Sequence, residues 1–382
     1  MKNAVVLGSG MVGSVMAADL SSDPGFRVRI VDSRPENLAR ANQRCHGRAE
    51  TREADLSDSK SIRAAIADAD IVLGALASHL GLNALKTVIE ARKPYCDISF
   101  MAEDAIDFSS FAEGAGVTAV VDCGVAPGMS NLLAGYAAKV LAPCESIEIY
   151  VGGLPVERRW PFEYKAGFAP SDVIEEYTRP SRIVEHGTIV VKPALSEPEL
   201  LDFEGVGTLE AFNTDGLRSL ATTLNVPFMK EKTMRYPGHI NLMRAMRETG
   251  LFSKEPVTVK GTTIVPLDLT SQLMFPKWTY EPGERDLTVM RISAVGIKAG
   301  VRTRLTWDLL DFLDPATGFT SMSRTTAFPC TIVARLIASG KISTKGVLPP
   351  ELIADPWIVE HLLSELGKRG VKYTFAEHAM PE

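Results

Sequence analysis

The chain opens MKNAVVLGSGMVGSVMAADL (residues 1–20), in which small residues separate an apolar run from an apolar-periodic segment. The run predicts a buried strand over residues 3–7, and the periodic segment predicts a helix over residues 11–20. The junction holds three glycines, Gly8, Gly10 and Gly13. Glycines there let the backbone turn tightly and approach an anion held by the free N–H groups of the helix N-terminus. An ordinary small-residue turn is the alternative, and the neighbouring segments decide between the two.

The segment FRVRIVD (residues 26–32) predicts a second strand, which ends on Asp32 and completes a strand-helix-strand unit. Asp32 lies 32 − 13 = 19 residues after Gly13, near the roughly 20 expected for the acid that accepts hydrogen bonds from an adenosine ribose. This agreement predicts a dinucleotide site. Its expected residues are Gly8, Gly10, Met11, Val12 and Gly13 at the pyrophosphate, Asp32 at the ribose, and Ala75 and Leu76 on the nicotinamide side.

The acid at the ribose bears on the choice of cofactor. Its charge repels the 2′-phosphate of NADP, so Asp32 favours NAD over NADP. Arg34 lies two residues further on, and its guanidinium would favour NADP if it turned toward that phosphate. A solvated side chain near the start of a helix is the other role open to Arg34. We therefore expect NAD rather than NADP.

Composition limits the class of protein. The 382 residues, of which 45% are hydrophobic and 23% charged, suit a soluble chain of about two domains with an ample core. The net charge of −6 predicts no nucleic-acid partner. Five scattered cysteines without C-x-x-C spacing predict neither a disulfide framework nor a metal site, and a reducing cytoplasm is the expected location. The sequence has no separate signal region and no uncharged run of spanning length, so we expect no membrane partner.

Strands and helices keep alternating as far as TAVVDCG (residues 118–124), which predicts an α/β, Rossmann-type doubly wound parallel sheet over residues 1–126. The alternation then stops. LTVMRISAVGIKAGVRTRLTWDLL (residues 287–310) predicts a hairpin that turns near Lys298, Ala299 and Gly300. We therefore expect a second, α+β domain with a mostly antiparallel sheet over residues 127–318, and a C-terminal segment, residues 319–382, that packs back on the first domain. The second sheet also suggests a homo-oligomer through an exposed face or edge.

Longer motifs in the expected second domain are specific to one family. These are IYVGGLPV (149–156), PFEY (161–164), LSEPELLDFEGVGTLEAFNTDG (195–216) and KTMRYPGH (232–239). With them the chain resembles the saccharopine dehydrogenase family, most closely its L-lysine 6-dehydrogenase branch, from the glycine pattern to KGVLPPE (345–351). The resemblance implies NAD-dependent oxidation of L-lysine at its ε-carbon, giving 2-aminoadipate 6-semialdehyde and ammonia; the aldehyde cyclises to piperideine-6-carboxylate. A saccharopine reductase of the same family is the alternative, and a non-catalytic dinucleotide-binding regulator is a further one.

The cations of the second domain bear on the substrate. Saccharopine carries two carboxylates more than lysine, and each is best held by an arginine fork. The segment YKAGFAPSDVIEEYT (164–178) has no arginine before Arg179. Asp172, Glu175 and Glu176 would suit a lysine ammonium if they faced the substrate, although a solvated helix face is the expected place for Glu175 and Glu176. The sequence therefore favours lysine over saccharopine or another N-substituted amino acid.

The chemistry needs a base, because a lysine ammonium with a pKa near 10.4 has no lone pair to support hydride loss. Ligands of such sheets bind beyond the carboxyl ends of the strands. The catalytic candidates there are His79, Asp97 and Asp122, with Cys123 as a possible lining thiol. His79 has a convenient ordinary pKa but also lies where a helix begins. The resemblance places acids at Asp97 and Asp122, so we expect one or both to order substrate or water.

The second domain supplies further candidates. Arg235 is the expected clamp for the substrate α-carboxylate, through a bidentate pair. His239 is a candidate for acid–base work, with a structural histidine as the equal alternative. Asn213, Thr214 and Asp215 are expected to line the pocket by the resemblance, although N-T-D-G also forms turns. Glu163 and Tyr164 are candidates for contact with the substrate amino group.

Overall fold

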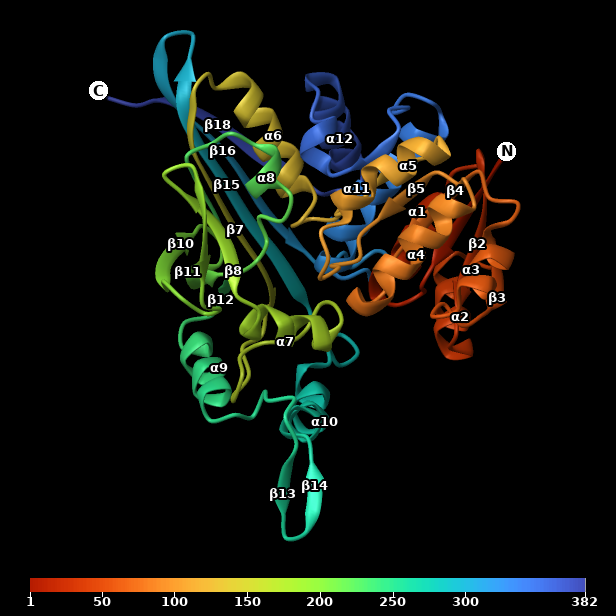
Figure 1. Ribbon diagram of the computed structural model, residues 1–382, viewed down its shortest axis with the longest axis horizontal. Coiled ribbons are helices and arrows are strands. Elements are labelled where there is room, and N and C mark those ends of the chain that lie inside the picture. Colours follow the sequence, from red (N-terminus) through yellow and green to blue (C-terminus); the bar gives the residue numbers. More distant parts are fainter. Residues whose placement is uncertain (382) are drawn as a thin grey trace. The chain divides into compact units, whose positions relative to one another are not determined.

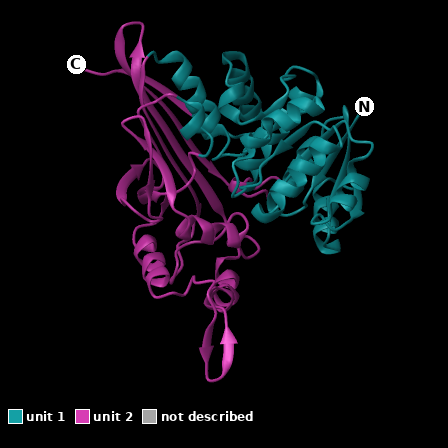
Figure 2. Ribbon diagram, in the orientation of Figure 1, with its two compact units in different colours: residues 1–142, 218–224, 323–373 teal, residues 143–217, 225–322, 374–382 magenta. Residues whose placement is uncertain are grey.

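The computed structural model describes residues 1–381 and divides them into two compact units (Figures 1 and 2). Unit 1 consists of Met1–Ala142, Arg218–Leu224 and Ser323–Tyr373. Unit 2 consists of Pro143–Leu217, Asn225–Met322 and the described chain from Thr374 on. The chain therefore passes between the units more than once, and the short segment Arg218–Leu224 belongs to unit 1 although both of its flanks belong to unit 2.

Unit 1 contains a seven-stranded parallel sheet with the order β17-β6-β5-β4-β1-β2-β3. Its strands are β1 (Lys2–Leu7), β2 (Phe26–Asp32), β3 (Glu50–Glu53), β4 (Ile71–Gly74), β5 (Tyr95–Asp97), β6 (Thr118–Val120) and β17 (Gly346–Leu348). The order reverses at β1, which pairs with β2 on one side and β4 on the other. This reversal is the topological switch point where doubly wound sheets bind their ligands. The predicted Rossmann-type sheet is confirmed.

Helices and short turns connect the strands of unit 1. They are α1 (Met11–Ser21), α2 (Pro35–Arg44), α3 (Ser59–Ile66), α4 (Ser78–Glu90), η1 (Ala105–Phe108), α5 (Ser109–Ala115), α6 (Met129–Val140), α8 (Leu220–Thr223), η2 (Pro350–Ile353) and α12 (Pro356–Lys368). α11 (Ser321–Ala338) begins at the unit boundary and continues into unit 1. A core of buried aliphatic side chains, including Val5, Val72 and Val88, lies between sheet and helices. Strands buried on both faces in this way explain why the sequence shows continuous apolar runs.

Unit 2 contains a nine-stranded mixed sheet in which β10-β11-β12-β7-β15-β16-β18 are neighbours and β8 and β9 form a side branch on β12. Its strands are β7 (Cys144–Pro155), β8 (Ser181–Glu185), β9 (Thr188–Lys192), β10 (Glu199–Phe203), β11 (Gly207–Asn213), β12 (Phe228–Arg235), β15 (Asp286–Lys298), β16 (Val301–Phe312) and β18 (Tyr373–Ala379). Its helices are α7 (Pro170–Thr178), α9 (His239–Glu248) and α10 (Pro266–Trp278), and a separate hairpin, β13 (Val257–Val259) with β14 (Thr262–Ile264), extends beyond α10 (Figure 1).

The predicted hairpin of unit 2 is confirmed in detail. Lys298 pairs with Val301, so Ala299 and Gly300 form a two-residue turn, both with positive φ. That conformation matches the twist of the flanking strands. The other strand pairs whose register is described are antiparallel, and β12 runs parallel to β7. The α+β class expected for this part of the chain is therefore confirmed.

The unit borders lie at Ala142 and Ser323, where the sequence suggested 126 and 318. The physical reason is packing, because α6 contacts η2 and α12 of the same unit. In addition, β17 pairs with β6, so part of the C-terminal segment is a strand of the parallel sheet. In residues 1–381, no helix is both long enough and apolar enough to cross a membrane.

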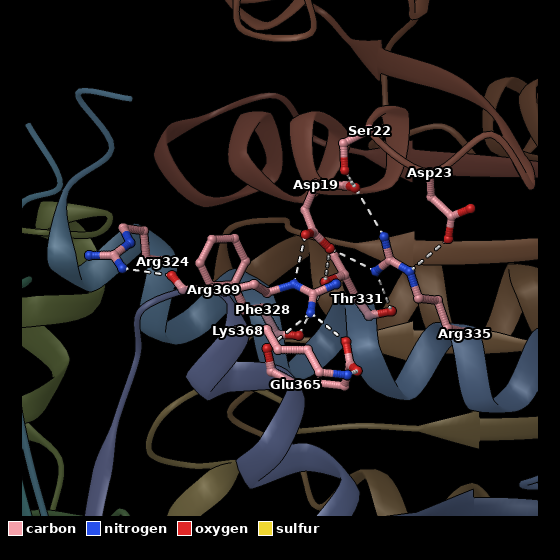
Figure 3. Close-up of polar contacts among 10 residues, drawn as sticks. All are labelled: Asp19, Ser22, Asp23, Arg324, Phe328, Thr331, Arg335, Glu365, Lys368 and Arg369. Atoms are coloured by element: carbon pink, nitrogen blue, oxygen red, sulfur yellow. Dashed lines mark hydrogen bonds and ion pairs between the residues drawn. The ribbon is translucent and has the colours of Figure 1, made fainter. Parts of the chain in front are cut away.

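A buried ionic network holds the C-terminal helices on α1 (Figure 3). The Asp19 carboxylate accepts hydrogen bonds from Arg335 Nη1 at 2.7 Å, Arg369 Nε at 2.8 Å and Thr331 Oγ1 at 2.6 Å. Burial alone would raise the pKa of Asp19, but the two arginine charges and the hydrogen bonds outweigh it, and the pKa lies below its ordinary value. One carboxylate on the first helix thus neutralises cations from the last part of the chain.

We predict that Asp19→Asn lowers the stability of the protein by about 1.5–3 kcal/mol, because it removes the charge that two largely buried guanidinium groups share and leaves each of them with one more exposed acid. Urea unfolding measures the change. Since the pKa of Asp19 is lowered in the folded state, the stabilisation is complete above the ordinary value of 3.8 and is lost as the pH falls through the folded pKa. The matched control is Asp23→Asn, which removes a more exposed partner of Arg335 and costs less than about 1 kcal/mol. Equal effects of the two substitutions would contradict the prediction.

Candidate active site

The glycine turn between β1 and α1 packs against the end of β4. Gly8 has φ +93°, and a Cβ there would lie 2.3 Å from the carbonyl oxygen of Ala75. A Cβ on Gly13 would lie 2.1 Å from the carbonyl oxygen of Gly8. A Cβ on Gly10 would meet nothing within 4 Å. Gly10 is the N-cap residue of α1, so no side chain covers the first N–H groups of that helix from the N-cap position. Two glycines are therefore required by packing, while the third leaves the helix N-terminus open to an anion.

Asp32 is fixed at the end of β2 beside this turn. Its Oδ2 accepts hydrogen bonds from Ser9 N at 2.7 Å and Ser9 Oγ at 2.9 Å, and its Oδ1 accepts one from Arg34 N at 2.9 Å. The Arg34 residue itself is exposed. The turn and the acid that were predicted to hold pyrophosphate and ribose are thus directly connected, and their chemistry fits a dinucleotide.

The nicotinamide-side candidates lie where β4 ends. Ala75 N donates to Leu7 O at 2.8 Å, which keeps Ala75 and Leu76 next to the glycine turn. His79 is exposed in the first turn of α4. Among the contacts that the structure describes, none links His79 to the buried acids at the neighbouring strand ends.

Asp97 ends β5 and is fully buried. Its Oδ1 accepts hydrogen bonds from Ser99 Oγ at 2.8 Å and Tyr95 OH at 3.2 Å, and its Oδ2 has no hydrogen-bond partner among the described residues. Burial raises the pKa of Asp97 to about 7; the hydrogen bonds from Ser99 oppose this shift, and the charge of Asp122 adds to it. A carboxyl group that titrates near neutral pH can both take up and return a proton.

Asp122 follows β6 and meets Arg218, which sequence reasoning missed. Arg218 Nε lies 3.3 Å from Asp122 Oδ2, and its guanidinium lies over the Phe100 ring, 5.0 Å from the centroid. The two ionic residues are only 5% and 2% exposed. Arg218 comes directly after the polar N-T-D-G-L run, and nothing in the sequence indicated that this arginine leaves unit 2 to reach a strand end of unit 1.

Cys123 lies between these acids. Its backbone N–H donates to Asp97 O at 2.8 Å. The hydrogen bond with Cys96 and burial raise the pKa of the Cys123 thiol well above its ordinary value, so the thiol is neutral near pH 7. Cys330 Sγ lies 3.4 Å from Cys96 Sγ. Cys96, Cys123 and Cys330 therefore form a group of buried thiols next to Asp97.

In unit 2 the structure brings Arg235, His239 and Tyr164 together, around a residue that was not predicted, Tyr177. Arg235 Nη2 binds Glu176 Oε2 at 2.6 Å, Nε lies 3.2 Å from Tyr177 OH, and the guanidinium lies over the Tyr164 ring at 4.4 Å. The expectation that Glu176 lies on a solvated face is wrong, because its side chain is 17% exposed and neutralises the buried Arg235. The predicted carboxylate clamp therefore already has a carboxylate partner.

His239 has both ring nitrogens in hydrogen bonds. Nε2 lies 2.9 Å from Tyr177 OH and Nδ1 lies 2.8 Å from Phe162 O. A carbonyl oxygen only accepts, so Nδ1 carries the proton and Nε2 accepts from Tyr177. Burial, together with the charge of Arg235, lowers the pKa of His239 to about 3, so the ring is neutral near pH 7.

The remaining predicted residues of unit 2 each have a partner in that unit. Asn213 Nδ2 donates to Glu197 Oε2 at 3.0 Å, and Thr214 Oγ1 donates to Glu231 Oε2 at 2.5 Å. Asp215 Oδ1 accepts from Arg182 Nε at 2.9 Å. Glu163 accepts from Arg158 Nε at 2.6 Å. Glu231 was not predicted either, and burial raises its pKa to about 8. The contacts of Asn213, Thr214 and Asp215 lie around the end of β11, whereas Glu163 forms a separate pair between β7 and α7.

A parallel sheet with a glycine turn at its switch point, and an acid bonded to that turn, places the chain among the Rossmann-type dinucleotide-binding proteins. The family comparison is more specific. Residues 4–120 match the saccharopine dehydrogenase NADP binding domain, and residues 124–371 match the saccharopine dehydrogenase C-terminal domain. The chain belongs to the saccharopine dehydrogenase family, as its motifs indicated. The match supports a nicotinamide dinucleotide as the ligand of the glycine turn, and its description favours NADP over the predicted NAD.

Relatives cover nearly the whole chain at low identity. The mitochondrial alpha-aminoadipic semialdehyde synthase of Bos taurus is 22% identical over 98% of this chain but 47% of its own length, so the chain spans about half of that relative. The saccharopine dehydrogenase [NADP(+), L-glutamate-forming] of Schizosaccharomyces pombe is 22% identical over 97% of this chain and 98% of its own. The apo saccharopine dehydrogenase (L-Glu forming) of Saccharomyces cerevisiae has the same fold, with a TM-score of 0.81, 19% identity and 99% and 100% coverage.

The contrast between the glycines generates a prediction. Gly8→Ala should destabilise the protein by about 2–5 kcal/mol, because a side chain at positive φ and a Cβ against a backbone carbonyl both cost free energy. Gly10→Ala should leave the unfolding temperature unchanged but weaken dinucleotide binding, because its methyl group points into the open space at the N-terminus of α1. Thermal unfolding and calorimetric titration with the dinucleotide separate the two effects. Loss of stability in Gly10→Ala, or undiminished binding by it, would refute the assignment.

Proposed function

We propose that the chain is a nicotinamide dinucleotide-dependent dehydrogenase that oxidises L-lysine at the ε-carbon. The products would be ammonia and 2-aminoadipate 6-semialdehyde, which cyclises to piperideine-6-carboxylate. The observation that carries the proposal is Asp97: a fully buried carboxyl group at a strand end of the dinucleotide sheet, with an unpaired Oδ2.

Asp97 suits the proton chemistry of an amine oxidation. The lysine ε-ammonium, with a pKa near 10.4, must lose a proton before its nitrogen can support hydride departure. Oδ2 is the atom available for that proton, because Ser99 and Tyr95 occupy Oδ1. The resulting imine then takes up water and the carbinolamine expels ammonia, which requires the proton to be returned. A group with a pKa of about 7 serves both directions. The bound dinucleotide supplies the acceptor for the hydride.

The ion pairs of two arginines in unit 2 support lysine rather than saccharopine as the substrate. Arg182 binds Asp215 and Arg235 binds Glu176, so both cations already face a carboxylate. The two additional carboxylates of saccharopine would have to compete with these buried acids, at a cost in desolvation. Oxidation of saccharopine is the second candidate, and the names of the fission-yeast relative and of the budding-yeast structure support it. A non-catalytic regulator is the third, and it gives no reason for a buried acid that titrates near neutral pH.

For the cofactor we propose NAD, within a family whose domain description favours NADP. The support is Asp32, whose carboxylate is fixed by Ser9 and by the Arg34 backbone at the ribose position. A 2′-phosphate would meet this negative charge, whereas a ribose hydroxyl would donate to it. Homo-oligomerisation and a cytoplasmic location stay predictions.

The direct test follows absorbance at 340 nm with L-lysine or saccharopine as substrate and NAD or NADP as acceptor. We expect reduction of NAD with L-lysine, accompanied by free ammonia, and a lower rate with NADP. Turnover of saccharopine alone would show that the paired arginines release their acids for the glutarate arm. A preference for NADP would show that Asp32 does not face the 2′ position.

Asp97→Asn tests the base. We expect kcat/KM for lysine to fall by about 100-fold or more, as general acid–base groups contribute, with dinucleotide affinity unchanged. In the wild type, kcat/KM should rise with pH around an apparent pKa of about 7, because Asp97 must be ionised to accept the proton and its pKa is raised to that value. The substitution should remove this rise. The matched control, Asp107→Asn, alters an exposed acid and should leave both rate and pH profile intact. An unchanged profile in Asp97→Asn would assign the base elsewhere.

A further inference from the structure

The ion pair between Asp122 and Arg218 leaves hydrogen-bonding capacity unused in a buried place. The pair makes a single contact of 3.3 Å, from Nε to Oδ2. Asp122 Oδ1 and Arg218 Nη1 have no hydrogen-bond partner among the described residues. An isolated structural pair would be expected to close into a bidentate fork, since unsatisfied buried polar groups cost free energy. One donor atom and one acceptor atom are therefore available to a ligand at this place.

Both residues also hold strained backbone conformations. Asp122 has φ +50° and Arg218 has φ +54°, in the left-handed region that residues other than glycine seldom adopt. Such strain persists only where surrounding structure enforces it, and it clusters at sites of function. Here the surroundings are specific: Arg218 lies over Phe100, and Thr223 of the same segment donates to Glu351 Oε1 at 2.8 Å. The guanidinium is thus positioned before a ligand arrives.

A small pocket adjoins the pair. Its lining includes Asp104, Ile106, Asp122, Arg218, Ser219 and Thr222, all of unit 1. The chemistry of the open atoms is that of a zwitterion receptor, with a cationic donor for an anion and, beside it, a carboxylate oxygen for a cation. An α-amino acid presents this pair of charges on one carbon.

We propose that Asp122 and Arg218 bind the α-amino-acid head group of the substrate. Arg218 Nη1 donates to the α-carboxylate, and Asp122 Oδ1 accepts from the α-ammonium. This inference rests on the proposed function and deepens it, because it replaces Arg235 as the carboxylate clamp and removes Asp122 from proton transfer. Asp97 ends the neighbouring strand, and Cys123 N donates to Asp97 O, so head group and reacting amine are served by adjacent strand ends.

Binding, measured without turnover, tests the head-group site. L-norleucine carries the head group but no ε-amine, hexanoate lacks the α-ammonium, and pentylamine keeps that ammonium but lacks the carboxylate. Calorimetric titrations use the full chain with saturating dinucleotide. We expect the wild type to bind L-norleucine at least about 10-fold more tightly than hexanoate or pentylamine, since hydrogen bonds to charged groups contribute about 1.5–3 kcal/mol, which is about 10- to 150-fold.

Substitutions then assign the charges. Arg218→Gln should weaken the binding of L-norleucine by about 10- to 150-fold and leave the binding of pentylamine unchanged. Asp122→Asn should reduce the preference for L-norleucine over hexanoate. The matched control is Arg92→Gln, because Arg92 is an exposed arginine that also has φ +54°, and it should bind like the wild type.

The outcomes separate the two proposals. Equal binding of the three ligands by the wild type, or unchanged L-norleucine binding in a folded Arg218→Gln variant, overturns the head-group site. If Arg218→Gln does not fold, the wild-type comparison of the three ligands decides alone. Tight L-norleucine binding without lysine oxidation would instead keep the head-group site and refute the proposed reaction.

Discussion

Close contact between Gly8 and the Ala75 carbonyl is the constraint on which the site depends. It brings the end of β1 against the end of β4 so tightly that a Cβ at Gly8 would lie 2.3 Å from that oxygen. The glycine turn therefore opens toward the edge of the sheet where parallel strands end. Asp32 and Asp97 end β2 and β5 at that edge, and Asp122 follows β6. Parallel strands present their carboxyl ends on one side, so a single backbone contact at the switch point arranges the cofactor turn and the acids together.

Burial alone does not decide what a carboxyl group does in this fold. Asp19 is largely buried and Asp97 is fully buried, yet the pKa of Asp19 is lowered and that of Asp97 is raised to about 7. Asp19 faces two guanidinium groups, whereas Asp97 faces hydroxyl groups and the negative charge of Asp122. The first acid is therefore held ionised and stabilises the C-terminal helices on α1. The second is left able to change its charge near neutral pH, which is the property a proton carrier needs.

The sequence predicted the features of the fold that depend on residues close to one another along the chain. The glycine turn, Asp32 and the Ala299–Gly300 hairpin turn follow from residues close in sequence. Contacts between distant segments were not predictable in this way. β17 joins the parallel sheet beside β6, and β12 runs parallel to β7, across large separations in sequence. Arg218 pairs with Asp122 because a short segment leaves unit 2, and Glu176 is half-buried because Arg235 needs a counter-charge. No periodicity in the sequence records such pairings.

A comparison of two buried arginines, Arg235 and Arg218, shows why the number of partners, rather than the residue type, indicates a ligand site. The Arg235 guanidinium donates hydrogen bonds to Glu176, Tyr177 and Met234 O. Its flat face also lies over the Tyr164 ring. A substrate carboxylate there would have to displace a buried acid, which then becomes an uncompensated charge. Arg218 is equally buried but makes one weak contact to Asp122 and keeps Nη1 open. A ligand at Arg218 adds hydrogen bonds without breaking any, so the same guanidinium chemistry favours structure at Arg235 and recognition at Arg218.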